Sequence, residues 1–545
     1  MSDFLSVTLP AILMLAGFAV FAAKRLLTYL HVFQQEEYDG LRFIRWLAQN
    51  VAFDKRVTIA LALAGFATPL LHGAGGISGH WIATVFALIF LLGQAAVEAD
   101  PRKAAKKKLA LTQRARRILL LAAALTAIPA AVCAALPAPV WLWLVPVQLI
   151  PFTLPLAVLI LAPHEAMVQK RFWAEAHDKL TRLNPTVIGI TGSFGKTSVK
   201  HILGHVLETV APTLITPGSV NTPMGIARVV RESLGPHHKF FVAEMGAYGP
   251  GSIARLCRLA PPDFAAITAI GHAHYERFKT LEAVAETKFE LAEAAIARGG
   301  KVVAPTALKE IGPAKQKMEA EPERYVTIGE EPDCALRILE SEQTADGVRV
   351  RLSWDGMEHE LTAPLFGAHH AVNLAVAFAS ACVMGVRPED AKLALKTAPQ
   401  IAHRLEVKPQ ADGSILVDDA YNSNPIGFQG AVETVALLKK KHGGRGILIT
   451  PGMVELGAAH EVLHRRAGEG AARHIDVLIA VAPERIEPLI EGFERAKKEA
   501  GETPEVLRVA SFADAQGWLS QNRRAGDVVL LENDLPDLYE RKLSL

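Results

Sequence analysis

The chain is poor in cysteine, and this scarcity excludes several kinds of protein. Its four cysteines are Cys133, Cys257, Cys334 and Cys382. None of them shares the short spacing of a metal-binding motif, and so few thiols in a long chain argue against a disulfide framework and fit a reducing compartment. The formal net charge is only +2, so no nucleic-acid partner is expected.

The sequence also lacks internal repeats, low-complexity tracts and the features of a signal peptide. The first apolar stretch is not preceded by a basic segment, and Lys24–Arg25 follow it. Apolar residues, by contrast, are abundant: they make up 50% of the 545 residues. The excess is concentrated in residues 1–165. The length predicts about three or four domains.

Five apolar stretches in this region each approach the roughly 17–25 residues that cross a bilayer as a helix. They lie at about Ser6–Ala23, Val57–Leu71, Trp81–Val97, Ile118–Leu136 and Val140–Ala162. The second stretch is the shortest. The sequence therefore predicts an α-helical membrane domain of about five transmembrane helices over residues 1–165, with membrane lipids as partners.

The basic residues between these stretches predict an orientation. Six Lys or Arg residues lie in the segment 24–56 and eight in the segment 102–117, whereas 73–80 and 137–139 contain none. The positive-inside rule puts both basic segments in the cytoplasm. The N-terminus is then outside, and everything after the fifth span is inside. We expect a multi-pass protein of the bacterial inner (cytoplasmic) membrane.

From about Thr186 the pattern changes to short β-branched runs that alternate with amphipathic helical stretches. The runs lie at Thr186–Thr191, Lys239–Glu244, Phe264–Ile270, Gly446–Thr450, Asp476–Val481 and Asp527–Leu531. This alternation predicts parallel sheets covered by helices. A break near Pro399–His403 divides the region into a central domain, 184–400, and a C-terminal domain, 401–545.

A glycine-rich run, TGSFGKTS at Thr191–Ser198, follows an apolar strand and opens a helix. This is the setting of a phosphate-binding loop, in which backbone N–H groups and a helix N-terminus surround phosphate oxygens. Lys196 is expected to neutralise the β- and γ-phosphates of ATP, and the Thr197 hydroxyl to hold Mg²⁺. The predicted ATP-binding residues of the loop are Gly192, Ser193, Gly195, Lys196, Thr197 and Ser198.

Three further motifs follow in chain order. The strand run ends in Glu244, which suits a metal at the C-terminal edge of a sheet. After the next strand come HAHYERF at His272–Phe278 and TKFE at Thr287–Glu290. Alone, a histidine such as His274 is more often structural, and a helical lysine such as Lys288 is more often solvated.

Taken together, these motifs resemble the Mur ligases, and most closely the UDP-N-acetylmuramoyl-tripeptide–D-alanyl-D-alanine ligase branch. That branch reads roughly VTGSxGKT, an ELGA strand end, AHLEGF, and a lysine in AKxE. The resemblance continues at Gly367–Asn373 (GAHHAVN), His403–Leu405 (HRL), Asp418–Pro425 (DDAYNSNP) and Pro451–Gly457 (PGMVELG). It covers about residues 184–535, and the ordered set is more specific than any single motif.

The resemblance implies a P-loop central domain, a Rossmann-like C-terminal domain and an ATP-dependent, ADP-forming amide ligase. ATP would convert an acceptor carboxylate to an acyl phosphate, and an amine would then attack that carbonyl. Glu244 and His274 match Mg²⁺ ligands with Thr197, and Lys288 matches a lysine that family members carry as a carbamate, a further metal ligand. The implied catalytic residues are Lys196, His274, Lys288 and Arg404.

Nucleotide and substrate contacts are implied in the same way. Asn373 matches an adenine contact, and Arg404 matches an arginine that approaches the phosphates from the domain junction. Asp418 or Asp419 would reach the ribose. The residues expected to border the incoming amine are Asn422 and Asn424.

The chain departs from the family pattern in several places. The five apolar stretches stand where family members have a soluble acceptor-binding domain. Thr268–Ala269 and His369–His370 replace the expected Asn-Asn and His-Asn pairs, Pro451–Met453 replaces Gly-Asp-Met, and Glu532–Asp537 replaces a Lys-Gly-Ser. The last two changes lie where the amine would bind, so the amine need not be D-alanyl-D-alanine.

Several functions remain open at this point. The leading hypothesis is a ligase that joins an amino acid or dipeptide to a lipid-linked peptidoglycan precursor at the inner membrane face. A UDP-linked muramoyl peptide, with the spans as a plain anchor, is the second. A folate or poly-amino-acid ligase and a non-ligase membrane P-loop ATPase are further alternatives, but the motifs at Lys288 and Asp418–Asn424 argue against an ATPase.

Overall fold

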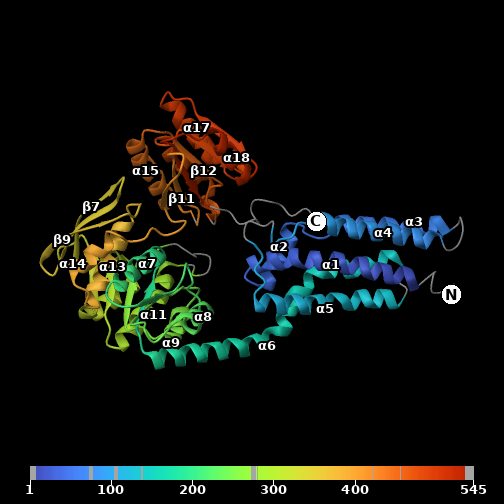
Figure 1. Cartoon of the computed structure of the whole chain (residues 1–545), viewed down its shortest axis with the longest axis horizontal. Coiled ribbons are helices and arrows are strands. Elements are labelled where there is room, and N and C mark those ends of the chain that lie inside the picture. Colours follow the sequence, from blue (N-terminus) through green and yellow to red (C-terminus); the bar gives the residue numbers. More distant parts are fainter. Residues whose placement is uncertain are drawn as a thin grey trace. The chain divides into compact units, whose positions relative to one another are not determined.

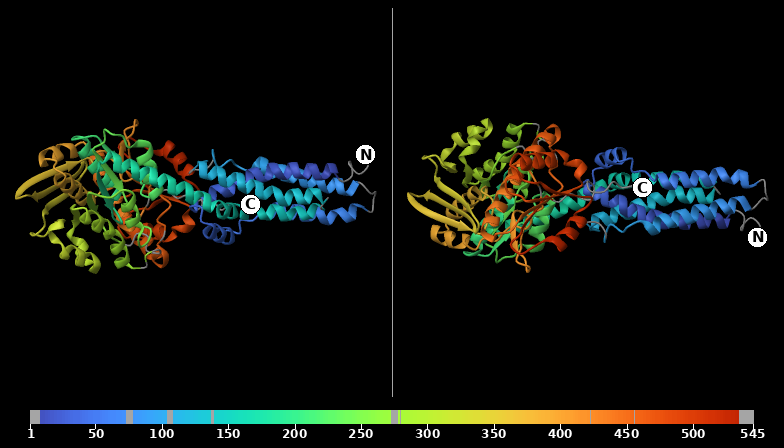
Figure 2. Two further views of the ribbon diagram at one scale, coloured as in Figure 1. Left: turned by 90° about the horizontal axis from the view of Figure 1, so that it is seen from below. Right: turned by 90° about the horizontal axis from the view of Figure 1, so that it is seen from above.

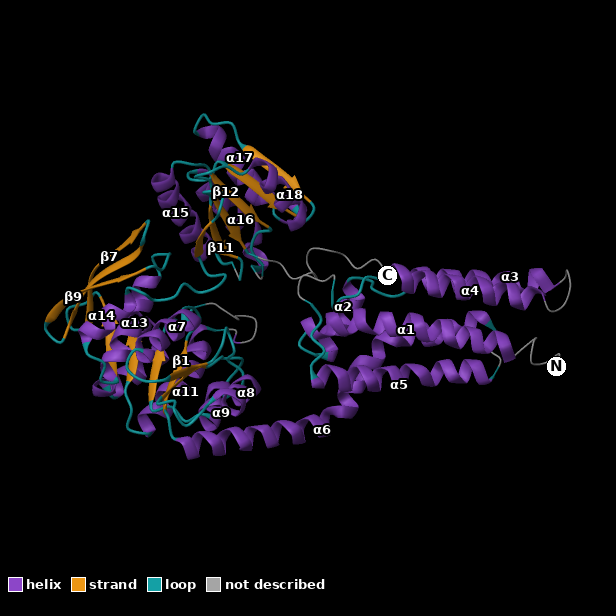
Figure 3. Ribbon diagram, in the orientation of Figure 1, coloured by secondary structure: helices purple, strands orange, loops and turns teal. Residues whose placement is uncertain are grey.

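The structure, a computed structural model, describes residues 8–72, 78–103, 108–136, 139–271, 278, 280–421, 423–454 and 456–533. The chain divides into two compact units, with the boundary between Val168 and Gln169. The first is helical and the second contains two β-sheets with their helices (Figures 1 and 3). The boundary lies within one continuous helix, α6 (Leu144–Leu183).

Long helices form wherever the sequence is strongly apolar. The helical unit consists of α1 (Leu9–Gln35), α2 (Gly40–Gln49), α3 (Lys55–His72), α4 (Ser78–Val97), α5 (Gln113–Ala135), the 3₁₀ turn η2 (Val140–Trp143) and the first part of α6. The long helices of this unit run side by side (Figure 2). Of the described helices, three segments are long and apolar enough to cross a membrane, namely Leu9–Gln35, Gln113–Ala135 and Val140–Leu183. The predicted helices are present. Among the described residues a shorter apolar helix, Trp81–Val97, accompanies the three long ones, and the number of spans stays a prediction.

Buried charges connect α1 to the ends of two other helices. The Arg25 guanidinium lies 2.8 Å from a carboxylate oxygen of Asp54 and 3.1 Å from one of Glu98. The Tyr29 hydroxyl donates to Asp54 at 3.2 Å. Because Asp54 immediately precedes α3 and Glu98 immediately follows α4, this network lies at one end of the helical unit. Pairing makes burial of these charges tolerable.

The second unit contains a nine-stranded sheet in the order β2-β3-β1-β4-β5-β6-β7-β8-β9. Its strands are β1 (Thr186–Thr191), β2 (Thr213–Ile215), β3 (Phe240–Glu244), β4 (Phe264–Ile267), β5 (Val302–Pro305), β6 (Tyr325–Gly329), β7 (Leu336–Thr344), β8 (Gly347–Trp354) and β9 (Met357–Ala363). Neighbouring strands are parallel as far as β7, and β7, β8 and β9 form an antiparallel meander.

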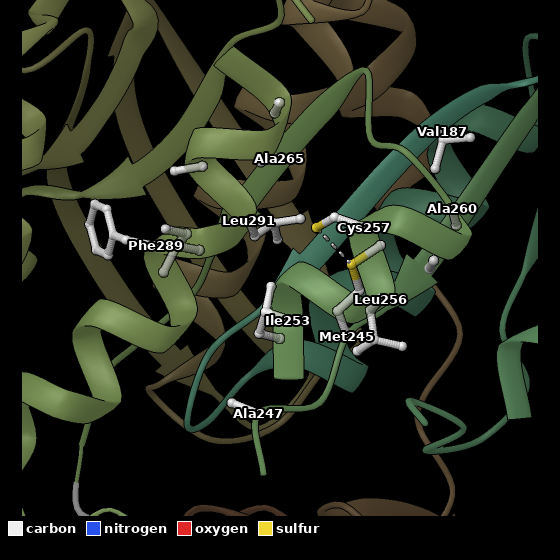
Figure 4. Close-up of a cluster of buried hydrophobic side chains, with 14 of the residues drawn as sticks. Val187, Met245, Ala247, Ile253, Leu256, Cys257, Ala260, Ala265, Phe289 and Leu291 are labelled. Atoms are coloured by element: carbon white, nitrogen blue, oxygen red, sulfur yellow. Dashed lines mark hydrogen bonds between the residues drawn. The ribbon is translucent and has the colours of Figure 1, made fainter. Parts of the chain in front are cut away.

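Helices cover both faces of this sheet. One face packs against α7 (Lys196–Glu208), α13 (His370–Val383) and α14 (Pro388–Leu395), and the other against α8 (Pro223–Ser233), α9 (Ser252–Leu259), α11 (Leu281–Ala297) and α12 (Gly312–Ala320). Adjacent residues of β3 divide between the two cores: Phe241 packs with Phe289 and Leu291, whereas Val242 joins the other core. Figure 4 shows the first core around Leu291 and Leu256.

A separate six-stranded sheet follows, in the order β10-β11-β15-β12-β13-β14. Its strands are β10 (Glu406–Pro409), β11 (Ile415–Asp419), β12 (Gly446–Thr450), β13 (Val477–Val481), β14 (Glu505–Val509) and β15 (Val528–Glu532). Only β10 is antiparallel to its neighbour. On one face lie α15 (Pro425–His442), α16 (His460–Ala472) and α17 (Glu487–Glu499), and on the other lies α18 (Phe512–Asn522). The predicted parallel α/β architecture is therefore present.

Candidate functional site

The strand order of the nine-stranded sheet defines a crevice at the end of β1. After β1 the chain builds β2 and β3 on one side, and then crosses to build β4 on the other. In open parallel sheets, ligands bind at the carboxyl ends of the strands at such a reversal of order. The glycine-rich run follows β1 directly, so the predicted phosphate-binding loop lies at this point.

Two positions in the loop have no room for a side chain, because neighbouring groups lie too close to them. A Cβ atom on Gly192 would lie 1.9 Å from the Thr268 hydroxyl, and one on Gly195 would lie 2.4 Å from the side-chain oxygen of Asn373. Gly195 also has φ +80°, a left-handed conformation that glycine adopts without strain. The loop thus follows a tight path into α7, whose buried first turn contains Thr197 and Ser198.

The loop is also fastened to the end of β4. The Ser193 hydroxyl donates to the carbonyl oxygen of Gly271 at 3.0 Å and accepts from the Gly271 N–H at 3.0 Å. The Thr268 hydroxyl donates to the carbonyl oxygen of Phe194. Thr268, one of the departures from the family pattern, therefore holds the loop in place, a role that the sequence did not reveal.

Lys196 lies at the centre of the site's electrostatics. Its ammonium donates to the carbonyl oxygens of Gly192 at 2.7 Å and Ser193 at 3.2 Å. Burial lowers the pKa of Lys196, the nearby charge of Glu244 opposes that shift, and the charge of Arg404 adds to it. Glu244 and Arg404 are thus both within electrostatic range of the lysine.

Asn373 provides a test of whether the site fits a nucleotide. It is buried beside Gly195, and its amide nitrogen has no hydrogen-bond partner in the described part of the chain. A buried donor without a partner is costly. A purine ring nitrogen is an acceptor that would satisfy it, so this asparagine and the loop together fit the predicted ATP.

Glu244 is a buried carboxylate surrounded by donors. The Thr197 hydroxyl donates to its Oε2 at 2.9 Å, the Lys200 ammonium lies 3.2 Å from the same oxygen, and the Asn221 amide donates to its Oε1 at 3.1 Å. Thr197 and Glu244, predicted independently as metal ligands, are therefore in contact. Their two oxygen donors suit Mg²⁺.

Lys200 was not identified from the sequence, and in the structure its side chain is completely buried. It lies four residues after Lys196 on α7, so the two side chains share one face of the helix. That spacing places Lys200 near Lys196 but does not reveal its partner Glu244. Burial lowers the pKa of Lys200, while Glu244 beside it opposes the shift.

Lys288, on α11, is a buried lysine near the same site. It is 4% exposed, and no hydrogen bond or ion pair of its ammonium is found among the described residues. Burial, assisted by the charge of Lys196, lowers its pKa to about 7. The neighbouring Glu290 accepts backbone N–H bonds from Gly251 at 2.7 Å and Ala254 at 2.8 Å, and so fixes α11 against the start of α9.

The described residues contain no group of three His, Cys, Asp or Glu side chains that could hold a metal. His274, the predicted histidine ligand, lies outside the described residues. A lysine ammonium cannot ligate a cation. The carbamate of Lys288 would supply oxygen donors, so the predicted ligand set depends on that modification.

Two aspartates hold the residues on either side of Arg404. Asp418 Oδ2 lies 3.0 Å from the imidazole Nδ1 of His403, and Asp419 Oδ1 accepts the N–H of Leu405 at 3.1 Å. Both predicted ribose contacts are thus engaged with the two residues that flank Arg404. Their contact with a ribose stays a prediction.

The predicted amine-binding asparagines are placed only in part. The side-chain oxygen of Asn424 caps α15 by accepting the N–H groups of Ile426 at 3.2 Å and Gly427 at 3.0 Å. Asn422 lies outside the described residues.

A pair of carboxyl groups connects β11 to β15. Asp419 and Glu532 are register partners on these adjacent strands, and Glu532 is completely buried. Burial raises the pKa of Asp419 to about 6, and burial with the neighbouring Asp419 raises that of Glu532 well above its usual value. The hydroxyl of Ser423 donates to Glu532. The pair therefore retains a proton near neutral pH.

Replacing Glu532 with glutamine should stabilise the protein in alkaline buffer. Because both folded pKa values are raised, folding takes up protons, and stability is lost as pH rises through about 6 for Asp419. Glutamine stays neutral, accepts from Ser423 and donates to Asp419. We expect Glu532→Gln to raise Tm by ~3 °C at pH 8 but leave it nearly unchanged at pH 5.

Thermal unfolding of the full chain in detergent, followed by circular dichroism, measures this difference. The exposed Glu505 on β14 provides a matched control, Glu505→Gln. Identical pH dependence in the wild type and Glu532→Gln would contradict the shared proton.

Comparison with known proteins agrees with this geometry. Residues 190–381 match the Mur ligase middle domain, and residues 403–532 match the Mur ligase glutamate ligase domain. The UDP-N-acetylmuramoyl-tripeptide–D-alanyl-D-alanine ligase of Mycobacterium leprae is 31% identical over 383 residues, which span 64% of this chain and 70% of that protein. The Bacillus subtilis enzyme of the same name is 28% identical over 382 residues, spanning 67% of this chain and 78% of that protein.

Solved structures share the fold. MurF from Acinetobacter baumannii matches with a TM-score of 0.55 and 24% identity, covering 67% of this chain and 77% of that one. MurF from Thermotoga maritima, solved in complex with ADP, matches with a TM-score of 0.55 and 23% identity, covering 69% of this chain and 81% of that one. The chain therefore belongs to the Mur ligase family, whose members are ATP-dependent, ADP-forming amide ligases.

Proposed function

We propose that this ligase extends a muramoyl-peptide precursor of peptidoglycan at the inner face of the bacterial inner membrane. The amine would be an amino acid or a dipeptide. The observation that carries the proposal is the contact between the helix after the glycine-rich loop and Glu244. The Thr197 hydroxyl donates to Glu244 at 2.9 Å, and the Lys200 ammonium lies 3.2 Å from the same oxygen. Asn373 lies beside Gly195 of the same loop, so segments far apart in the chain meet there, which supports a nucleotide site.

The proposed roles follow from charge and contact. Lys196 and Arg404 would meet the phosphate charge, and electrostatic stabilisation of this kind is a major source of catalysis in phosphoryl transfer. Thr197, Glu244 and the carbamate of Lys288 would hold Mg²⁺, together with His274. Bound Mg²⁺–ATP supplies the phosphoryl group that activates the acceptor carboxylate.

The other assignments complete the nucleotide and amine sites. Asn373 would contact adenine, with Asp418 or Asp419 near the ribose. Asn422 and Asn424 would border the amine. These residues belong to a proposed central domain, 184–400, and a proposed C-terminal domain, 401–545, both in the cytoplasm.

The surface of the helical unit supports its insertion in a membrane. Large apolar side chains face outward on several helices, including Phe66 at 79% exposed and Leu120 and Leu159 each at 71%. Soluble monomers rarely leave such large apolar areas uncovered. We propose that residues 1–165 form a multi-pass membrane domain with lipid neighbours.

The short helix α2 supports the same proposal. It buries Phe43 and Leu47 but exposes Leu41 at 78% and Ile44 at 40%. Arg42 lies between these residues in the sequence and is also exposed. An apolar exposed side with adjacent arginines is typical of a helix at the membrane interface.

The acceptor is where this ligase would differ from its relatives. The Mycobacterium leprae and Bacillus subtilis relatives are named for a UDP-linked muramoyl tripeptide and D-alanyl-D-alanine. In this chain the helical unit precedes the family-matched region, which begins at residue 190. We propose a lipid-linked acceptor, because confinement to the bilayer would raise its effective concentration at a membrane-bound enzyme.

The full chain reconstituted in liposomes tests this proposal. Lipid-linked and UDP-linked muramoyl peptides would be offered with a panel of amino acids and dipeptides, and phosphate release and product mass would be measured. We expect at least ~10-fold higher kcat/KM for the lipid-linked acceptor. Liposomes with the Lys196→Ala variant define the background. Equal or better use of the UDP-linked acceptor would show that the helical unit is only an anchor.

A further inference from the structure

The guanidinium of Arg404 lies over an aromatic ring. Its central carbon is 4.3 Å from the centroid of the Tyr421 ring, within the roughly 6 Å at which a cation is attracted to the face of an aromatic ring. Tyr421 is 50% exposed, so its ring is not needed to fill a core. Its contact with Arg404 therefore points to a role at the site.

The backbone that carries Arg404 is strained. His403 has φ +61° and Leu405 has φ +49°, so both neighbours of Arg404 adopt a left-handed conformation that is unfavourable for residues with a Cβ atom. The carboxylates of Asp418 and Asp419 hold the two residues, as described above. In addition, the Tyr421 N–H donates to the carbonyl oxygen of His403 at 3.2 Å. The run that starts at Asp418 thus fixes the direction of Arg404.

The hydroxyl of Tyr421 reaches the central sheet. It donates to the hydroxyl oxygen of Ser219 at 2.7 Å. Ser219 belongs to a short segment, residues 216–221, that follows β2 and surrounds Glu244. Within it, the Thr216 hydroxyl accepts the Glu244 N–H at 3.1 Å, and the Asn221 amide donates to the Glu244 carboxylate at 3.1 Å.

We propose that Tyr421 is the positioning residue for Arg404 and that Ser219 latches Tyr421 to the segment around Glu244. The ring holds the guanidinium, and the hydroxyl fixes the ring relative to the carboxylate that the proposed function assigns to Mg²⁺. This inference rests on the proposed role of Arg404. It adds a direct physical link, through Tyr421 and Ser219, between Arg404 and the segment that holds Glu244.

The test compares three substitutions in the full chain. Tyr421→Leu removes the ring, and we expect kcat to fall roughly 5- to 20-fold with KM for ATP within about two-fold. Tyr421→Phe keeps the ring and loses only the hydroxyl, so its loss should be about two- to three-fold. Ser219→Ala should match Tyr421→Phe. The double variant Tyr421→Phe/Ser219→Ala should be no slower than either single variant.

A second cycle distinguishes positioning from folding. Because Tyr421 acts through Arg404, the variant Arg404→Ala/Tyr421→Leu should be as slow as Arg404→Ala alone, whereas a general structural defect would add to it. The surface variant Ser520→Ala, on α18, is a control that should retain wild-type kcat.

Each failure has its own signature. Near wild-type activity of Arg404→Ala would remove the proposed role of the arginine itself. If Arg404→Ala is inactive but Tyr421→Leu matches the wild type, the positioning inference alone is wrong. A higher KM for the amine with unchanged kcat in Tyr421→Leu would make the tyrosine a substrate contact and would likewise overturn it.

Discussion

Replacing Lys196 with alanine should lower kcat for ligation by ~10³-fold or more, because preorganised charges on a transferring phosphoryl group have effects of that size. Lys196 donates to the carbonyl oxygens of Gly192 and Ser193, so its ammonium is held within the phosphate-binding loop. Lys200, the next lysine on α7, is paired with Glu244 and completely buried, and cannot replace it. ADP release coupled to amide formation measures the effect.

The exposed Lys396, just after α14, provides a control for loss of a positive charge. Lys396→Ala should retain wild-type activity, and both variants should show the same circular dichroism. Ligation by Lys196→Ala at a rate near that of the wild type would disprove the ATP-site assignment.

Loss of Lys288 should also lower kcat strongly, for a different reason. Only a neutral amine reacts with CO₂, and burial lowers the pKa of Lys288 to about 7, so a large fraction is neutral at cellular pH. We expect Lys288→Ala to lose at least ~10²-fold in kcat, because the carbamate would be a ligand of Mg²⁺. Added acetate or propionate should restore part of the activity by supplying a carboxylate.

Lys288→Arg is a matched variant that keeps the positive charge but cannot form a carbamate. It should be as inactive as Lys288→Ala and should not respond to CO₂. The wild-type enzyme should lose activity in rigorously CO₂-free buffer and regain it with bicarbonate. Full activity without CO₂, or an active arginine variant, would rule out the carbamate.

The regular elements of the fold were largely predictable from local pattern. The runs Thr186–Thr191 and Gly446–Thr450 form β1 and β12 with the predicted bounds, and the run at Lys239–Glu244 differs from β3 by one residue. Buried parallel strands are nearly continuous apolar runs between polar turns, so they stand out. The run ending at Ile270 was predicted too long, because β4 stops at Ile267 and the following residues turn to hold the phosphate loop.

The membrane region shows a limit of apolar patterns. Hydropathy located the helices, and the structure adds that α2 buries Phe43 and Leu47 on one side. Hydropathy did not indicate that Arg25 lies in a buried ion-pair network with Asp54 and Glu98. These contacts join residues about 30 to 70 positions apart, a separation at which local periodicity carries no information.

The candidate site was predictable only where a residue belongs to a recognisable motif. Lys196, Glu244 and Lys288 were identified in that way. Lys200 reads as an ordinary lysine of an amphipathic helix, and its partners Gly218 and Glu244 lie 18 and 44 residues away. Tyr421 was quoted within a motif, but its contact with Ser219 spans 202 residues. Such roles arise from tertiary contact alone.

The ion pair between Lys200 and Glu244 affects what happens between rounds of catalysis. In the proposed reaction the nucleotide departs after every turnover. Glu244 has its own internal counter-charge at 3.2 Å, along with the donors Thr197 and Asn221. A buried carboxylate without a partner would destabilise the sheet by several kcal/mol. Because Lys200 pairs with Glu244, release of the product does not leave an unpaired buried carboxylate. The enzyme without nucleotide therefore stays folded between turnovers.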